Sequence, residues 1–97
     1  MYQIKETIIN TEFNGLTPVK LASKDGCETI LISLEKGHDF PEHTSPRDAT
    51  LVVLEGDIEF MINDNKYLLL KHQVFNFPAH IKHWVHANEN SKFLIIR

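Results

Sequence analysis

The chain has 97 residues, of which 42% are hydrophobic and 24% are charged, and its formal net charge is -3. This length predicts one domain spanning residues 1–97, because two smaller units would each bury too little apolar surface. The slight acidity and the scattered Lys and Arg residues argue against a nucleic-acid partner, and no apolar run approaches the roughly 20 residues of a membrane span.

The N-terminal residues 1–16 precede the first clear strand pattern. A weak helical tendency in residues 3–9 lacks a stop signal, so we expect residues 1–16 to form an arm or an edge strand. No positively charged region followed by an apolar run is present there, and Cys27 is the only cysteine. These features predict a cytoplasmic protein without an intrachain disulfide.

Eight short runs rich in Ile, Leu, Val, Phe and Thr then follow, each closed by Gly, Asn, Asp or Pro. They occupy residues 18–23, 28–35, 49–55, 57–62, 66–71, 74–79, 82–88 and 92–97. The connections between most of them are turns, too short for the helices that join parallel strands. The pattern predicts an all-β protein, a sandwich or barrel of antiparallel strands.

The runs at residues 28–35 and 49–55 are apolar on both faces. Leu51 and Val53 share one face of the run at 49–55, whereas Val52 and Leu54 share the other. A strand that is buried on both sides needs a cover on its outer face. We expect a second sheet or a second subunit to supply that cover, and the second option predicts a homodimer.

One stretch carries the spacing of a known motif. Gly37, His43 and Gly56 match the first glycine, the first histidine and the last glycine of G-x5-H-x-H-x3-4-E-x6-G. Ser45 stands in place of the second histidine, and Ala49 stands in place of the glutamate.

A second stretch matches G-x5-P-x-G-x2-H-x3-N in part. Pro78 and His83 fall on the proline and the histidine, whereas His72, His80 and Ala87 replace the two glycines and the asparagine. Together the two stretches resemble the cupins, over about residues 26–97. The resemblance implies an antiparallel jelly-roll β-barrel with a ligand or metal site in its mouth.

The residues themselves indicate how such a site is built. Positions 43, 45 and 49 have the same parity, so an unbroken extended segment projects their side chains to one face, and positions 83, 85 and 87 do likewise. The imidazoles of His43 and His83 are therefore expected to converge inside the barrel. They are the candidate ligands of a divalent metal such as Zn, Ni, Fe or Mn, although protein sites commonly supply at least three ligands.

Four nearby side chains are candidates for a missing ligand. Glu42 and Asp48 have the wrong parity and need a bulge to turn inward. His86 faces the other way on its strand, and His80 lies near a strand entry. Asp48 or His86 turned toward the histidine pair would restore a three-ligand site.

The sequence therefore predicts a small-molecule pocket and leaves three functions open. The candidate ligand-binding residues are Phe40, His43, Ser45, Leu51, His83 and Val85. The first function is binding of a small polar molecule, and the second is metal-dependent catalysis of dioxygenase or isomerase type through His43 and His83. The third is a structural dimerisation module. No phosphate loop, nucleophile elbow or Cys-x-x-Cys pair is present, so no catalytic residue is assigned.

Overall fold

The computed structural model describes residues 1–97 and consists of nine strands and one short helix. The elements are α1 (Thr7–Asn10), β1 (Leu16–Lys24), β2 (Cys27–Leu34), β3 (Asp39–His43), β4 (Ala49–Glu55), β5 (Asp57–Ile62), β6 (Asn65–Leu70), β7 (Val74–Phe77), β8 (His83–Ala87) and β9 (Ser91–Ile96). The helix lacks the length and apolar character needed to cross a membrane.

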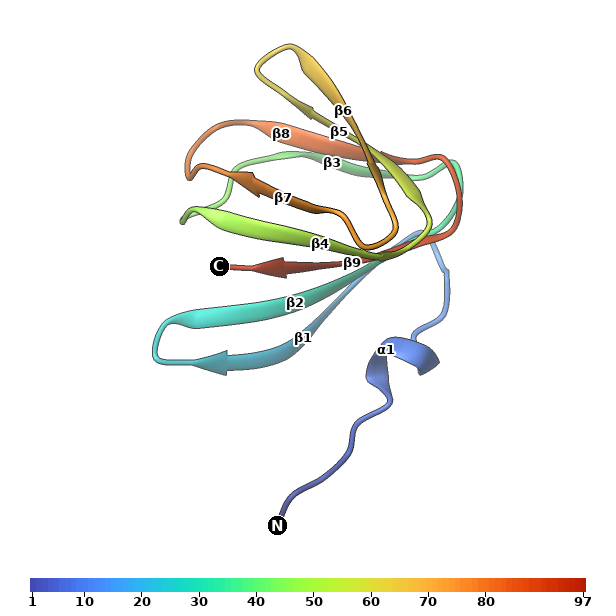
Figure 1. Ribbon diagram of the computed structural model, residues 1–97, viewed down its shortest axis with the longest axis vertical. Helices are drawn as coiled ribbons and strands as arrows, with labels where there is room; N and C mark the ends of the chain where they lie inside the picture. Colours follow the sequence, from blue (N-terminus) through green and yellow to red (C-terminus); the bar gives the residue numbers. More distant parts are fainter.

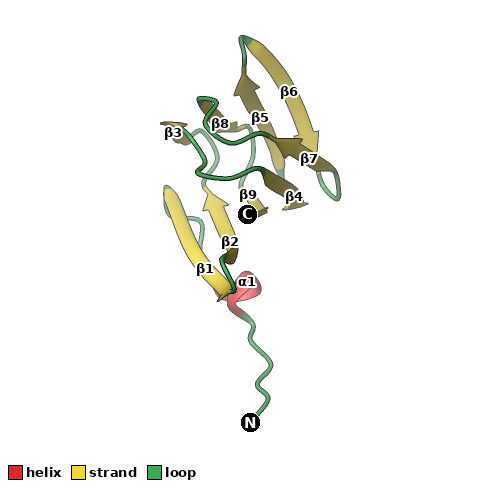
Figure 2. Cartoon of the chain, turned by 90° about the vertical axis from the view of Figure 1, so that its left-hand side faces the viewer, coloured by secondary structure: helices red, strands yellow, loops and turns green.

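The strands form two antiparallel sheets that face each other (Figures 1 and 2). The five-stranded sheet has the order β1-β2-β9-β4-β7, and the four-stranded sheet has the order β3-β8-β5-β6. The predicted all-β, antiparallel jelly-roll barrel is confirmed. All eight predicted strands are present, and their ends lie within two residues of the expected ones.

The strand that the sequence did not predict is β3. Its sequence, DFPEH, does not alternate between apolar and polar residues, and Pro41 lies at its centre. Proline cannot donate a hydrogen bond to a neighbouring strand, so it is tolerated mainly at sheet edges. The topology satisfies this condition, because β3 is an edge strand that pairs only with β8.

The core lies between the two sheets and follows the period of two expected for strands. In β4, Ala49, Leu51 and Val53 are buried, whereas the residues between them are half-buried on the outer face. The same alternation buries Ile58, Phe60 and Ile62 in β5. Fourteen buried hydrophobic residues from both sheets form one continuous cluster.

The segment before β1 is an arm that contains one helical turn, and no strand forms there (Figure 1). Buried Lys92 holds the arm to the five-stranded sheet, because its Nζ donates to the carbonyl of Ile8 at 2.6 Å. The hydroxyl of Ser33 donates to the carbonyl of Glu12 at 2.9 Å. The arm thus covers part of the outer face of β2, and the homodimer stays a prediction.

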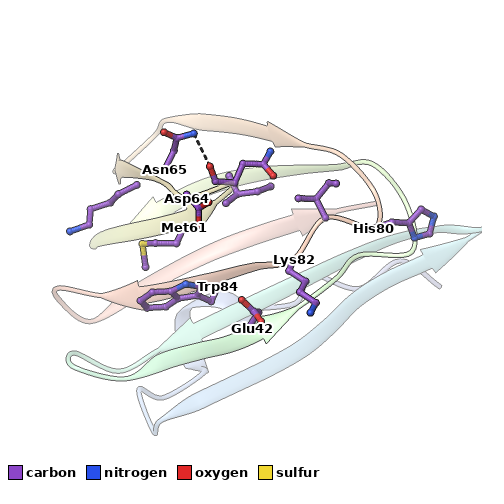
Figure 3. A pocket seen from close by; sticks show the side chains of 11 residues that line it. Glu42, Met61, Asp64, Asn65, His80, Lys82 and Trp84 are labelled. Carbon is purple, nitrogen blue, oxygen red and sulfur yellow. Dashed lines mark hydrogen bonds between the residues drawn. The ribbon is translucent and has the colours of Figure 1, made fainter.

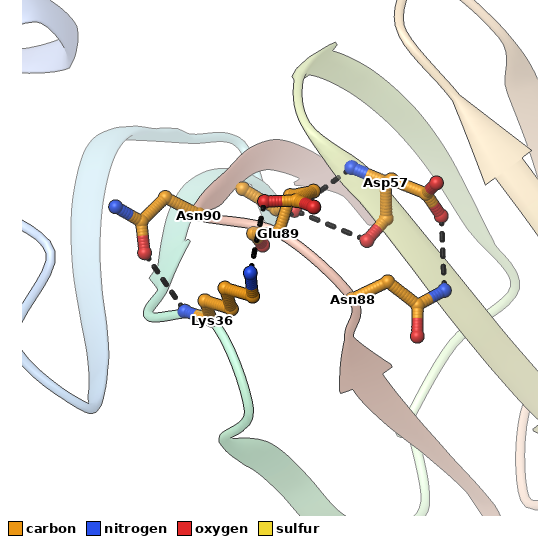
Figure 4. Close-up of polar contacts among 6 residues, drawn as sticks. Lys36, Asp57, Asn88, Glu89 and Asn90 are labelled. Atoms are coloured by element: carbon orange, nitrogen blue, oxygen red, sulfur yellow. Dashed lines mark hydrogen bonds and ion pairs between the residues drawn. The ribbon is translucent and has the colours of Figure 1, made fainter.

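Three chain reversals meet at one end of the barrel (Figure 4). The backbone N–H of Asp57 donates to Ser91 Oγ at 3.0 Å, and Asn88 Nδ2 donates to Asp57 Oδ1 at 3.0 Å. The backbone N–H of Lys36 donates to Asn90 Oδ1 at 2.8 Å. This network joins the β2–β3, β4–β5 and β8–β9 connections, and it leaves the opposite end of the barrel free to form a cavity.

Candidate functional site

A cavity of about 370 Å³ lies between the two sheets, near the end of β9. Eight of the fourteen residues around it are hydrophobic. The residues are Pro18, Ile30, Ile32, Phe40, His43, Thr44, Ser45, Phe60, Phe77, His83, Val85, Phe93, Ile95 and Arg97. The cavity is therefore an apolar hollow with a few polar groups, as is typical of sites for small organic molecules.

The imidazoles of His43 and His83 meet in this cavity. His43 ends β3, His83 begins β8, and the two residues are partners in the register of these strands. Their Nε2 atoms are 3.1 Å apart, and the ring planes are inclined by 69°. The strand pairing thus brings together two residues that are forty positions apart in the sequence.

Each ring is held by a backbone carbonyl two residues before it. His43 Nδ1 lies 2.6 Å from the carbonyl oxygen of Pro41. His83 Nδ1 lies 2.9 Å from the carbonyl oxygen of Ile81. These two contacts fix the ring orientation and direct both Nε2 atoms toward each other.

Phenylalanine rings surround the pair. The ring of Phe40 stacks on His43 with centroids 4.1 Å apart and an interplanar angle of 17°. Phe60 stacks on His83 at 5.2 Å and 15°, and Phe77 lies 4.6 Å from the same imidazole. His83 is almost completely enclosed, with 2% of its surface exposed.

This enclosure determines the charge of His83. Burial lowers the pKa of His83 below its ordinary value of 6.5, and the neighbouring His43 lowers the pKa further, while the hydrogen bond to Ile81 opposes the shift. Burial therefore favours the uncharged form of the His83 imidazole at neutral pH.

The lowered pKa predicts a pH dependence of stability. The unfolded chain binds the proton of His83 more readily than the folded chain does, so the free energy of unfolding falls as the pH drops below about 6.5. Urea unfolding at a series of pH values measures this slope. His83→Gln is expected to make the slope shallower, whereas His72→Gln, at an exposed loop position, is expected to leave it unchanged. An unchanged slope in His83→Gln contradicts the assignment.

Five of the six residues predicted to line a pocket border this cavity. They are Phe40, His43, Ser45, His83 and Val85. Leu51 does not: it points inward as its parity indicates, but it is fully buried in the core. Ser45 reaches the cavity from a loop, because the extended segment ends at His43. Its hydroxyl donates to the carbonyl of Arg47 at 2.6 Å.

The four candidates for a third ligand lie elsewhere. Asp48 Oδ1 accepts from the N–H of Ala79 at 2.9 Å, and His86 Nδ1 lies 2.6 Å from Asp39 Oδ1. Glu42 and His80 border a separate groove of mixed polar and apolar residues that includes Trp84 (Figure 3). None of the four borders the cavity that contains the histidine pair.

The donor set does not fit a resident transition metal. Among the residues that border the cavity, only His43 and His83 offer strong metal-ligand atoms, their Nε2 nitrogens. No group of three or more His, Cys, Asp or Glu residues is placed to hold a metal ion. Ala49 has no donor atom, and the Ser45 hydroxyl is already engaged with a carbonyl. Protein sites for zinc and related metals commonly supply three or four ligands.

Sequence reasoning did not identify several residues of the cavity wall. Phe60, Phe77 and Phe93 occupy inward positions of their strands, so parity was the available signal. Parity separates inner from outer positions, but it does not separate side chains that border a hollow from those sealed in the core. Arg97 follows the last strand, and no motif in the sequence marked it as a pocket residue.

Comparison with known proteins places the chain in a family. The sequence model described as cupin domain matches residues 30–96. A search of curated proteins found no match.

Solved structures show the same fold. An RmlC-like cupin protein from Desulfovibrio desulfuricans aligns with a TM-score of 0.86 and 19% identity, over 99% of this chain and 95% of that one. A conserved protein of unknown function from Streptococcus pyogenes aligns with a TM-score of 0.85 and 23% identity, over 99% of this chain and 86% of that one. A cupin superfamily protein from Desulfitobacterium hafniense aligns with a TM-score of 0.82 and 26% identity, over 91% of this chain and 81% of that one.

Proposed function

The chain belongs to the cupin family, and from this premise we propose that it binds a small organic molecule in the cavity beside His43 and His83, without a resident metal ion. The observation that carries the proposal is the cavity itself. Its volume of about 370 Å³ falls within the range of ligand sites, and its wall is mainly aliphatic and aromatic.

The polar groups of the cavity support recognition of a ligand. The two imidazoles approach each other from different strands, and the Phe40 ring stacks on one of them at the cavity wall. An apolar wall supplies most of the binding free energy, while a few fixed polar groups select the ligand and orient it. The carbonyls of Pro41 and Ile81 fix the two imidazoles in this way.

The proposal is for binding, without a covalent step. The Ser45 hydroxyl donates to a carbonyl instead of to a base, and Cys27 is exposed and is not part of the cavity wall. An activated nucleophile needs a base within hydrogen-bond reach. The cavity holds no such pair.

A thermal-shift screen of small metabolites tests the proposal. A ligand at 100 times its dissociation constant is expected to stabilise the protein by about 2.7 kcal/mol. His43→Ala is expected to reduce the shift, whereas His86→Ala, on the outer face of β8, serves as the matched control and is expected to retain it. Absence of any shift across a broad panel contradicts the binding function.

Metal analysis tests the second part of the proposal. Protein purified without a histidine tag is expected to contain far less than one equivalent of any transition metal, because two imidazoles hold a metal weakly. Stoichiometric metal that disappears in His43→Ala would contradict the metal-free site and favour metal-dependent catalysis.

A further inference from the structure

We propose that the ligand carries a carboxylate group, which pairs with the guanidinium of Arg97 while the apolar body of the ligand occupies the cavity. This inference rests on the proposed function, because it specifies the chemistry of the molecule that enters the same cavity. It follows from the position of Arg97, from its incomplete pairing within the protein and from the absence of other ionised Lys, Arg, Asp or Glu side chains around the cavity.

Arg97 is the only Lys, Arg, Asp or Glu residue among the fourteen that border the cavity. Phe93 and Ile95, which also border it, precede Arg97 at every second position, so the three side chains share the inward face of an extended chain. The N–H of Arg97 donates to the carbonyl of Glu28 at 2.9 Å, and the N–H of Glu28 donates to the carbonyl of Arg97 at 2.6 Å. These two bonds continue the pairing of β2 with β9 and fix the base of the arginine side chain.

The protein neutralises the Arg97 guanidinium only in part. Its Nε lies 3.4 Å from Glu28 Oε1, and its two Nη atoms donate no hydrogen bond to the protein. The Glu28 carboxylate lies closer to Lys20, whose Nζ is 3.0 Å from Oε2. Two positive charges thus share one negative charge, and one positive charge is left over. The Arg97 side chain is only 25% exposed, so solvent screens its charge less than that of a free surface arginine.

A carboxylate matches this arrangement best. A guanidinium binds a carboxylate through two parallel N–H···O hydrogen bonds, and the Nη atoms of Arg97 are available for them. One carboxylate also balances the one remaining positive charge. A phosphate dianion would leave a negative charge unpaired beside an apolar wall, which is unfavourable. The hydrophobic residues of the cavity favour an aliphatic or aromatic body, so the predicted ligand is an apolar monocarboxylic acid.

Pairs of an acid and its amide test the inference by calorimetric titration at neutral pH. Benzoate, cyclohexanecarboxylate and 3-phenylpropanoate are each compared with the corresponding primary amide, which has nearly the same size and shape but no charge. Each acid that fits the cavity is expected to bind about tenfold more tightly than its amide, because hydrogen bonds between charged groups are the stronger ones. Equal affinities of acid and amide in every pair overturn the inference.

Two further probes define the charge that the site accepts. Benzamidine has the shape of benzamide and a positive charge, and it is expected to bind more weakly than benzamide. Phenyl phosphate is expected to bind more weakly than benzoate, and tighter binding overturns the assignment to a carboxylate. A preference for acids that disappears when EDTA is present shows that a metal ion holds the carboxylate, and this result also overturns the inference.

Protein variants assign the preference to one side chain. Arg97→Gln is expected to abolish the preference for acids and to retain the affinity for the amides, which also reports that the cavity is intact. Arg97→Lys keeps the charge but loses the paired geometry, so it is expected to retain part of the preference. A full preference for acids in Arg97→Gln overturns the inference.

Arg47→Gln is the matched control, because it removes the same charge close to the same strand. The Arg47 guanidinium lies beside Gly26, in the turn before β2, with Nη1 3.3 Å from the position that an added Cβ would occupy. Arg47 is exposed and does not border the cavity. Arg47→Gln is therefore expected to preserve the preference for acids, and its loss in this variant contradicts the assignment to Arg97.

The outcomes separate this inference from the proposed function. Equal affinity of acids and amides, with chemical-shift changes at the cavity residues, overturns the carboxylate inference and leaves the binding pocket intact. Failure of every acid, combined with a hit from an uncharged metabolite in the thermal-shift screen, does the same. Failure of the acids and of the whole screen removes both.

Discussion

Gly56→Ala is expected to lower the free energy of unfolding by about 2–6 kcal/mol, as the sum of backbone strain and overpacking. Gly56 forms the corner between β4 and β5 and has φ +94°, a conformation that residues with a Cβ rarely adopt. An added Cβ would lie 2.6 Å from the carbonyl oxygen of Asn90 and would also overlap Ser91. Because these are backbone atoms and a buried side chain, the corner cannot relax cheaply.

Gly37→Ala is the matched control for this substitution. Gly37 has a similar φ of +83°, but an added Cβ would meet nothing within 4 Å. We expect Gly37→Ala to cost only the strain, about 1–3 kcal/mol. Urea unfolding measures the free energy of unfolding of both variants. Equal losses of stability would show that the β4–β5 and β8–β9 corners are not in close contact.

Phe60→Ala is expected to destabilise the protein by about 3–5 kcal/mol. Phe60 is 1% exposed and packs against Phe75, Phe77 and the imidazole of His83. Its removal leaves a void between the sheets and admits water to His83. The pKa of His83 is therefore expected to rise toward its ordinary value, because burial is the main cause that lowers it.

Phe75→Ala controls for the loss of an aromatic ring. Phe75 lies in the same cluster but is only half-buried, so we expect a clearly smaller loss of stability. Chemical denaturation gives the free energies, and an NMR titration of the histidine side chains gives the pKa. Similar losses in the two variants would contradict the central position of Phe60 in the core.

The strand pattern was predictable because each run obeys a simple physical rule. In β4 and β5, apolar residues face the core at every second position, and Gly or Asn turns close the runs. The rule failed at β3, where Pro41 and charged residues interrupt the alternation. An edge strand makes fewer hydrogen bonds and buries fewer side chains, so its sequence is less constrained.

The convergence of His43 and His83 was also predictable, but for an incomplete reason. Parity indicated that both side chains face inward, whereas their distance depends on the pairing of β3 with β8, and the sequence did not predict β3. The hydrogen-bond partners of the Asp48 and His86 side chains were not predictable either. Asp48 accepts from the N–H of Ala79, and His86 pairs with Asp39, so both contacts required the tertiary structure.

The extent of the cavity depended on packing that a sequence does not specify. Leu51 and Phe60 both occupy inward positions, yet only Phe60 borders the hollow. Side-chain volumes and the spacing of the sheets determine where apolar contacts end and a cavity begins. The N-terminal arm is a similar case, because Lys92 anchors it from more than eighty positions away.

The ¹⁵N chemical shifts of the His43 and His83 side chains test the central claim most directly. Long-range ¹H–¹⁵N spectra of the ligand-free, metal-free protein at neutral pH distinguish protonated from unprotonated ring nitrogens. The structure predicts that Nδ1 carries a hydrogen in both rings, because each Nδ1 contacts a backbone carbonyl oxygen. An unprotonated Nδ1 in either ring would contradict the arrangement in which the carbonyls of Pro41 and Ile81 orient the two imidazoles in the cavity.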